Sequence, residues 1–387
     1  MQPLVALYEE ILRALDARRL VREACARLPR QPLLLALGKA AGEMVQGACD
    51  ALGDCPGVVA LKPDAPAPGG AARVYRGDHP IPDQGSLDAG EALLAAARAA
   101  TTPALVLISG GGSSLAEVPI DGVSLARLRE INTALVRSGA PIEEMNVVRK
   151  HLSRLKGGGL ARALWAAGVR TATALVAVDV PLGGFPAVAS GPAAADPSTR
   201  AQALEIARRL GLAELDFLET LKPGEPADFV EHVAICDMRS AAVFAGQRGA
   251  RILEAPVHGP LEALLRKLTQ ARGFVVASGE PDIRIPASAP PGGRSQHLAL
   301  SMARELRGEP KAVFLAAGTD GRDGATNAAG AVVTGATWDE AVSRGLAPDR
   351  ALAEFDATRV LEALGATLPA RHTGAHAGDV FLLQRQD

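Results

Sequence analysis

The sequence has few aromatic residues and little net charge. Phe, Trp and Tyr make up 3% of its 387 residues, and the formal net charge is −2 at pH 7. Nucleic-acid-binding domains present a basic surface, and those that bind single strands add aromatic side chains on which bases stack. We therefore expect a small-molecule ligand and no nucleic-acid partner.

Closely spaced cysteines and long apolar runs are also missing. The four cysteines show no CxxC spacing, which argues against a zinc site or a disulfide framework and predicts reduced thiols in a cytoplasmic protein. The longest uncharged stretch, around residues 99–116, contains Pro103 and three consecutive glycines, so it is a poor membrane span. Charges interrupt residues 1–28, which predicts an amphipathic helix there and no targeting segment.

Two common nucleotide-binding motifs are absent. The segment LGKAAG around Lys39 lacks the upstream glycine of GxxxxGK[ST], and Leu115 stands where a GxGxxG fingerprint would have its last glycine. The sequence therefore contains neither a P-loop nor the usual nicotinamide-binding turn.

Short apolar runs alternate with alanine-rich helical segments, which is typical of parallel α/β layers. The Pro- and Gly-containing segment 221–230 predicts a boundary between two domains, residues 1–230 and 231–387. The expected strands are residues 33–37, 57–61, 104–109, 173–178, 251–255, 274–278 and 312–317. The expected helices are residues 39–52, 86–100 with Ser86 as the cap, and 295–306.

Polar residues directly follow several of these apolar runs. In open parallel sheets, ligands bind beyond the carboxyl ends of the strands, so these residues are candidates for a common binding edge. They are Lys39, residues 109–114, Asp179, Glu280, Asp320 and Asp323.

The segment SGGGSS, residues 109–114, is the most distinctive of these strand ends. Consecutive glycines let backbone N–H groups approach an anion, and a following helix adds its positive end. We expect the loop to bind a phosphate or a carboxylate, and the alternative is an ordinary tight turn between a strand and a helix. The candidate binding residues are Gly110, Gly111, Gly112, Ser113 and Ser114.

Charged residues near the other strand ends suit phosphate chemistry. Lys39 would neutralise a phosphoryl group, and Arg294, at a predicted helix start, would form paired hydrogen bonds to phosphate or carboxylate. Asp179 would act as a base or a metal ligand, and Asp320 with Asp323 would bind Mg²⁺ or orient a hydroxyl. The alternatives are solvated cations at helix starts and aspartates that only cap turns.

The segment MNVVRKHLSRLKGGGLARAL concentrates cationic side chains before three glycines. A single helix could not place all of them on one face, so a solvated surface helix is the alternative to a binding role.

In this order along the chain, GKAA, GDHPIPDQGS, SGGGSS, VRKHLSRLKGG, ASGPAAADPST, GGRSQHLAL and GTDGRDGATNAAGA resemble the glycerate 2-kinases of the MOFRL family. The resemblance implies phosphoryl transfer from ATP, with Mg²⁺, to the 2-hydroxyl of D-glycerate. It also implies a Rossmann-like first domain with a three-layer parallel sheet, a smaller α/β (MOFRL) domain, and a site in the cleft between them.

The resemblance further implies catalytic roles for four residues: Lys39, Asp179, Arg294 and Asp320. His151, Lys156 and Ser190 lie in the same motifs, and we expect them to bind phosphate or substrate. Glycerate and ATP are the expected partners, with no membrane partner and with a homodimer as an alternative to a monomer.

Four positions depart from the family pattern. Gly183 stands where SDVxGD has its second aspartate, so no metal ligand is expected there. Ser295 replaces the asparagine of GGRN, and TGAHAGD has Gly378 and Asp379 where TGPTxTN has threonine and asparagine. Ligand contacts from these loops are therefore expected to differ.

Two other functions are weighed against the kinase. Relatives of this family have also been labelled hydroxypyruvate reductases, but that reaction needs a nicotinamide site and the missing GxGxxG counts against it. The other is a glycerate-binding protein that has lost catalysis, which Gly183 and the altered C-terminal loop would explain.

Overall fold

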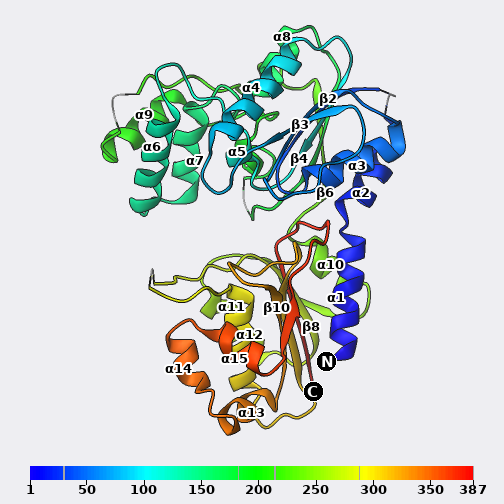
Figure 1. Cartoon of the computed structure of the whole chain (residues 1–387), viewed down its shortest axis with the longest axis vertical. Helices are drawn as coiled ribbons and strands as arrows, with labels where there is room; N and C mark the ends of the chain where they lie inside the picture. Colours follow the sequence, from blue (N-terminus) through cyan, green and yellow to red (C-terminus); the bar gives the residue numbers. More distant parts are fainter. Residues whose placement is uncertain (29–30, 182, 213–214, 287, 387) are drawn as a thin grey trace. The chain divides into compact units, whose positions relative to one another are not determined.

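The computed structural model describes residues 1–28, 31–181, 183–212, 215–286 and 288–386, and the chain forms two compact units (Figure 1). The first unit is Ala17–Ile235, and the second combines Met1–Asp16 with Cys236–Asp387. The second junction lies close to the predicted boundary at residue 230. The expected first domain needs correction at its start, because residues 1–16 belong to the second unit.

A six-stranded sheet forms the centre of the first unit, in the order β3-β2-β1-β4-β5-β6. The pairs β3–β2, β2–β1, β1–β4 and β4–β5 are all parallel. The strands are β1 (Leu33–Leu37), β2 (Gly57–Leu61), β3 (Ala72–Arg76), β4 (Ala104–Ile108), β5 (Ala172–Ala177) and β6 (Val230–Cys236).

Helices cover both faces of this sheet, which confirms the three-layer Rossmann-like expectation. On one face, Met44 and Val45 pack with Leu34 and Leu105, and on the other face a core that includes Leu93 and Leu164 contains the alternate strand residues. The helices are α2 (Ala17–Cys25), α3 (Ala41–Leu52), α4 (Gln84–Arg98), α5 (Gly112–Leu115), α6 (Leu125–Arg137), α7 (Ile142–His151), α8 (Gly159–Ala166) and α9 (Arg200–Arg209), with a 3₁₀ turn at Val188–Ser190.

The strand order reverses between β1 and β4. The chain runs outward from β1 through β2 to β3 and then returns to β4 on the other side of β1. A crevice forms beyond the carboxyl ends of the strands at such a switch point, and ligands bind there. Lys39 and the glycine loop follow the two strands that flank it.

The second unit contains a mixed six-stranded sheet in the order β11-β10-β9-β12-β8-β7. β12 is antiparallel to both β8 and β9, and β7 is parallel to β8. The strands β7, β8 and β9 therefore end at the edge where β12 begins. The strands are β7 (Arg251–Val257), β8 (Gly273–Gly279), β9 (Val313–Gly318), β10 (Ala328–Thr334), β11 (Thr367–Pro369) and β12 (Asp379–Arg385).

A helical layer buries one face of the second sheet, while α1 contacts α10 and β9. Tyr8 of α1 donates a hydrogen bond from its hydroxyl to the carbonyl of Gly318, at the end of β9, over 2.6 Å. The helices are α1 (Gln2–Ala14), α10 (Ser240–Gly246), α11 (Leu261–Gln270), α12 (Arg294–Glu305), α13 (Thr337–Ser343), α14 (Pro348–Ala353) and α15 (Ala357–Ala363).

Two local expectations are wrong. The predicted helix over residues 1–28 is interrupted, and its two parts, α1 and α2, belong to different units. Asp83, not Ser86, caps α4: the Asp83 carboxylate accepts the Ser86 N–H, and the Ser86 hydroxyl accepts the Asp83 N–H, which forms a reciprocal capping box.

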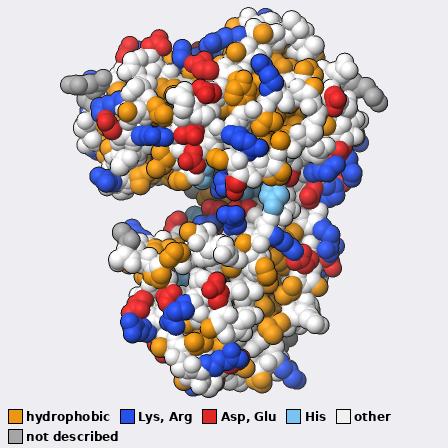
Figure 2. All heavy atoms as spheres, viewed as in Figure 1, with side chains coloured by type: hydrophobic (Ala, Val, Ile, Leu, Met, Phe, Trp, Pro, Cys, Tyr) orange, Lys and Arg blue, Asp and Glu red, His pale blue; other side chains and the backbone are white. Residues whose placement is uncertain are grey.

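The surface carries charges of both signs. On the face shown in Figure 2, Lys and Arg side chains are interspersed with Asp and Glu side chains on each unit. No helix within the described residues has the length and apolar character needed to cross a membrane.

Candidate active site

Lys39 and the glycine loop are held together by hydrogen bonds between the ends of β1 and β4. The Lys39 N–H donates to the Gly110 carbonyl over 2.9 Å, and the Ala40 N–H donates to the Ser109 hydroxyl over 3.0 Å. Gly38 has φ +129°, and a Cβ at this position would lie 2.2 Å from Ser109 Oγ. Glycine is therefore required before Lys39 for the two strand ends to approach this closely.

Gly111 makes room for two side chains that can carry positive charge. Its φ is +77°, and a Cβ here would lie 3.0 Å from Lys39 Cγ and 3.1 Å from His79 Cδ2. The bare backbone thus lies against the side chains of Lys39 and His79. The expected contribution of a helix end is small, because α5 is a single turn, Gly112–Leu115.

A second loop packs against the glycine loop from the β5 side. Asp179 follows β5 and is partly exposed. Further along the same connection, Ala189 and Ser190 have φ values of +50° and +60°, which is unusual for residues other than glycine. A Cβ on Gly112 would lie 2.8 Å from the Ala189 methyl group. Backbone strain of this kind concentrates at functional sites, which supports a role for this loop.

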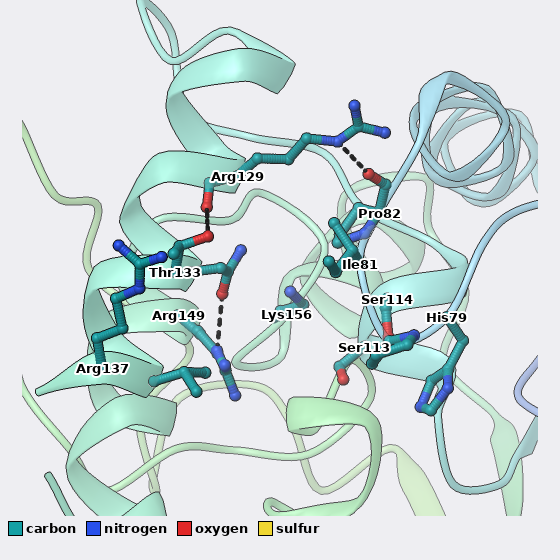
Figure 3. A pocket seen from close by; sticks show the side chains of 13 residues that line it. His79, Ile81, Pro82, Ser113, Ser114, Arg129, Thr133, Arg137, Arg149 and Lys156 are labelled. Carbon is teal, nitrogen blue, oxygen red and sulfur yellow. Dashed lines mark hydrogen bonds between the residues drawn. The ribbon is translucent and has the colours of Figure 1, made fainter. Parts of the chain in front are cut away.

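A cavity of about 450 Å³ opens beside the glycine loop in the first unit (Figure 3). Ser113, Ser114 and Lys156, all expected site residues, line it. Arg129 and Arg137 of α6 and Arg149 of α7 also line it, and His79 and Pro80–Pro82 complete the wall. Arg129 and Arg137 could not be predicted as cavity residues from the sequence, because arginines on an amphipathic helix usually face solvent.

Lys156 lies at the wall of this cavity with its charge already paired. It is 5% exposed and forms an ion pair with the equally buried Glu117. Ser153 donates from its hydroxyl to the other Glu117 oxygen over 2.5 Å. A buried pair with this additional hydrogen bond fixes the Lys156 ammonium in place.

His151 does not lie in the cavity, and its expected role as a ligand-binding residue needs correction. The side chain is completely buried, with Nδ1 2.8 Å from the Val147 carbonyl and Nε2 3.3 Å from Glu219 Oε1. Because these protein groups contact both ring nitrogens, the position of His151 is structural.

Arg294, the first residue of α12, is clamped by two carboxylates in the second unit. Its Nε donates to Asp379 Oδ2 over 2.5 Å, and an Nη lies 3.0 Å from Glu280 Oε1. Burial alone would lower the pKa of Arg294, but Asp379 and Glu280 outweigh it and raise that pKa above its usual value. Asp379, one of the departures from the family pattern, thus orients the arginine.

The two aspartates of the GTDGRDG loop have different environments. Asp320 is partly exposed, and its Oδ1 accepts the Arg322 N–H over 3.0 Å. Asp323 is buried at the start of α12, where it accepts the N–H groups of Ser295 and Gln296 over 3.0 and 2.7 Å. Burial and the nearby Asp379 raise the pKa of Asp323 to about 6, although these hydrogen bonds oppose the shift.

These environments decide which aspartate fits Mg²⁺. Among the described residues, no group of three or more His, Cys, Asp or Glu side chains is placed to hold a metal ion. Mg²⁺ commonly uses one or two carboxylates together with substrate phosphates. Asp320 fits that role, whereas the expectation for Asp323 needs correction because both of its oxygens cap α12.

Comparison with known proteins decides the family. Residues 4–219 match the model of a domain of unknown function, DUF4147, and residues 273–379 match that of the MOFRL family. The chain belongs to the DUF4147/MOFRL glycerate kinase family. The family expected from the sequence motifs is thereby confirmed.

Several members of this family resemble the chain over most of its length. The D-glycerate 2-kinase of Thermotoga maritima is 32% identical over 98% of this chain and 96% of that protein. The glycerate 2-kinase of Pyrococcus horikoshii is 31% identical over 90% and 86%, and an Agrobacterium vitis protein provisionally named a hydroxypyruvate reductase is 32% identical over 91% and 88%. The crystal structure of Thermotoga maritima glycerate kinase matches over 100% of both chains, with a TM-score of 0.86 and 30% identity.

Proposed function

We propose that the protein transfers a phosphoryl group from ATP to the 2-hydroxyl of D-glycerate, giving 2-phosphoglycerate and ADP. The observation that carries this proposal is the full-length similarity to a D-glycerate 2-kinase. The arrangement in the first unit supports it, because a lysine and a glycine loop meet at the switch point of a parallel sheet.

Phosphoryl transfer requires positioning and charge neutralisation more than covalent chemistry by the protein. Asp179 accepts the proton of the 2-hydroxyl as the new O–P bond forms and the bond between the γ-phosphorus and the bridging oxygen breaks. Lys39 offsets charge on the transferred group. In the second unit, Arg294 offsets phosphate charge in the orientation fixed by Asp379 and Glu280.

Mg²⁺ would neutralise charge on the nucleotide phosphates. Asp320 is the residue of the second unit that we assign to it, since one carboxylate oxygen is bonded to the Arg322 N–H and the side chain is partly exposed. Asp323 supports the site indirectly, because its carboxylate caps α12, the helix that begins with Arg294.

A coupled assay tests the proposed function. Purified protein is incubated with ATP, Mg²⁺ and D-glycerate, and enolase is added with no mutase. We expect phosphoenolpyruvate to form directly, because enolase acts on 2-phosphoglycerate. If phosphoenolpyruvate appears only after a mutase is added, the phosphorylated position is wrong.

The same preparation tests the reductase alternative, which the name of the Agrobacterium vitis relative raises. A nicotinamide-binding turn after β1 needs a second glycine for close approach of the pyrophosphate, and this chain has Ala40 after Gly38 and Lys39. We therefore expect no NADH or NADPH oxidation with hydroxypyruvate. Oxidation at a rate comparable to the kinase reaction would favour the reductase.

A further inference from the structure

The three arginines that line the cavity in Figure 3 have no carboxylate partner among the residues that the structure describes. Arg129, Arg137 and Arg149 form no ion pair within the part of the chain that the structure describes. By contrast, Lys156 in the same wall is neutralised by Glu117. The cavity therefore concentrates positive charge that the described part of the chain does not balance.

Hydrogen bonds to neighbouring groups hold the guanidinium groups of Arg149 and Arg129 in place. The Arg149 Nε donates to the Asn132 side-chain oxygen over 2.9 Å, and the Arg129 Nε donates to the Pro82 carbonyl over 2.8 Å. Both bonds use the inner nitrogen of the guanidinium group, which leaves the forked end for a ligand (Figure 3). Burial lowers the pKa of Arg149, and the nearby Glu117 only partly opposes this effect. A bound anion would relieve the cost of burying this cation.

The size and charge of the cavity distinguish the two anions of the proposed reaction. Its volume of about 450 Å³ lies in the range of drug-sized ligand pockets and far exceeds the needs of glycerate, a three-carbon acid with one negative charge. Three arginines that form no ion pair in the described ranges match a di- or triphosphate chain, which carries several negative charges. Ile81 and Val136, 55% and 63% exposed, add apolar surface to the same wall.

We propose that this cavity binds the polyphosphate of the nucleotide, with Arg137 and Arg149 as phosphate ligands and the serine end of the glycine loop at its inner wall. The proposal rests on the kinase function proposed above and assigns the glycine loop to the nucleotide rather than to the glycerate carboxylate. Arg129 and Arg137 become binding residues that the sequence motifs do not indicate, and Arg149 is one cation of the motif VRKHLSRLKGG.

The test compares Arg149→Met with Arg127→Met. Arg127 lies on α6 outside the cavity and pairs with Glu130 at the surface. ADP affinity is measured by calorimetry, and KM is measured separately for ATP and for glycerate. We expect Arg149→Met to weaken ADP binding and raise the KM for ATP about tenfold or more, the scale of one charged hydrogen bond. The KM for glycerate should stay within twofold, and Arg127→Met should match the wild type in all three.

Thermal stability adds a readout that a purely structural arginine would not give. Because Arg149 is half-buried and forms no ion pair among the described residues, Arg149→Met should melt close to the wild-type temperature when no ligand is present. Inorganic tripolyphosphate should compete with ADP for the wild type. Arg137→Ala, at an exposed position, provides a second variant if Arg149→Met does not fold.

A raised KM for glycerate with unchanged ADP affinity would overturn the proposal, and so would unchanged values of both. These outcomes are distinct from failure of the kinase function. ADP binding is measured without turnover, so it decides the role of the cavity even if no phosphoglycerate forms. Conversely, if the wild-type enzyme is active and Arg149→Met has the same ADP affinity and KM values, only the cavity assignment is refuted.

Discussion

Asp179 follows β5 without a second carboxylate four residues later, because Gly183 occupies that position. A pair of carboxylates there would suit a metal ion, whereas a single one suits a proton acceptor. In the second unit, by contrast, Asp379 and Glu280 both contact Arg294. At the residue scale, we therefore propose different tasks for the carboxylates of the two units: Asp179 acts on the acceptor, whereas Asp379 and Glu280 orient a cation.

Asp179→Asn tests the first of these tasks. If Asp179 accepts the hydroxyl proton, the variant should lose about 10²- to 10⁴-fold in both kcat and kcat/KM, because asparagine cannot take up the proton. ADP affinity and melting temperature should stay close to wild type. Partial rescue by Mn²⁺ or by high Mg²⁺ would instead indicate a metal ligand, and a fully active variant would refute the catalytic assignment.

At the scale of elements, the sequence predicts most of the parallel strands, although it misses β3, and it predicts β9 but not β10 or β12 among the antiparallel ones. β1, β4 and β5 are buried apolar runs followed directly by polar residues, so their ends and the closeness of Lys39 to the glycine loop could be inferred. β10 was not predicted, because Gly330 interrupts its apolar pattern. A Cβ on that glycine would lie 2.0 Å from the Ala316 carbonyl, a contact that only the folded sheet explains.

The cationic segment 145–164 shows that prediction of the candidate site from sequence is also limited by contacts that form only on folding. Its cations are divided among different surroundings, because α7 ends at His151 and a turn separates it from α8. Lys150 pairs with the buried Asp196 and Lys156 with Glu117, while Arg149 faces the cavity. Local sequence gives the charges but not their long-range partners, so it could not separate structural cations from binding ones.

Gly111→Ala, with Gly122→Ala as a matched control, tests the glycine loop. The two glycines have φ values of +77° and +80°, so alanine should strain the backbone by about 1–2 kcal/mol at either position. A Cβ at Gly122 meets nothing within 4 Å, whereas one at Gly111 meets the Lys39 side chain. We expect similar losses of unfolding free energy but a fall in kcat for Gly111→Ala alone. Equal kinetics of the two variants would contradict the assigned role.

We expect the stability of the loop that begins with Asp179 to depend on pH through His232 of β6. The ring of His232 stacks on Phe185 in this loop, with centroids 5.1 Å apart. Burial lowers the pKa of His232 below its ordinary value of 6.5, despite the hydrogen bond to the Val230 carbonyl. The folded state thus binds this proton less tightly than the unfolded chain. The stabilising contribution is complete above pH 6.5 and is lost as the pH falls below it.

Melting temperatures at pH 7.5 and 5.5 check this dependence. His232→Phe keeps an aromatic ring against Phe185 and removes the titrating group, so its melting temperature should fall less between the two pH values than that of the wild type. His258→Phe, at an exposed position, should keep the wild-type difference. Identical pH differences for all three proteins would exclude His232 as the cause.

At the scale of the whole molecule, the chain crosses between the units twice, after Asp16 and after Ile235. The second unit is therefore assembled from both ends of the chain, and α1 completes it by packing against α10 and β9. This arrangement could not be read from the sequence, because α1 and α2 form one nearly continuous amphipathic pattern.

Tyr8→Phe measures what α1 contributes to the second unit. The variant removes the hydrogen bond to the Gly318 carbonyl and should lower the unfolding free energy by about 0.5–1.5 kcal/mol, as measured with denaturant. Tyr75→Phe is the control, since within the described residues the Tyr75 hydroxyl forms no hydrogen bond. It should stay within about 0.5 kcal/mol of the wild type. Equal losses would show that α1 is not held by this bond.

The contact between Tyr8 and Gly318 joins residues 310 positions apart. A ribosome adds about 5–20 residues per second, so roughly 15–60 s pass between the synthesis of these two residues. During this interval the first unit can be completed, while the apolar side of α1, with Leu4, Leu7 and Ile11, has no β9 to pack against. The helix α1 is therefore synthesised long before β9 and reaches its native contacts only after β9 has been made.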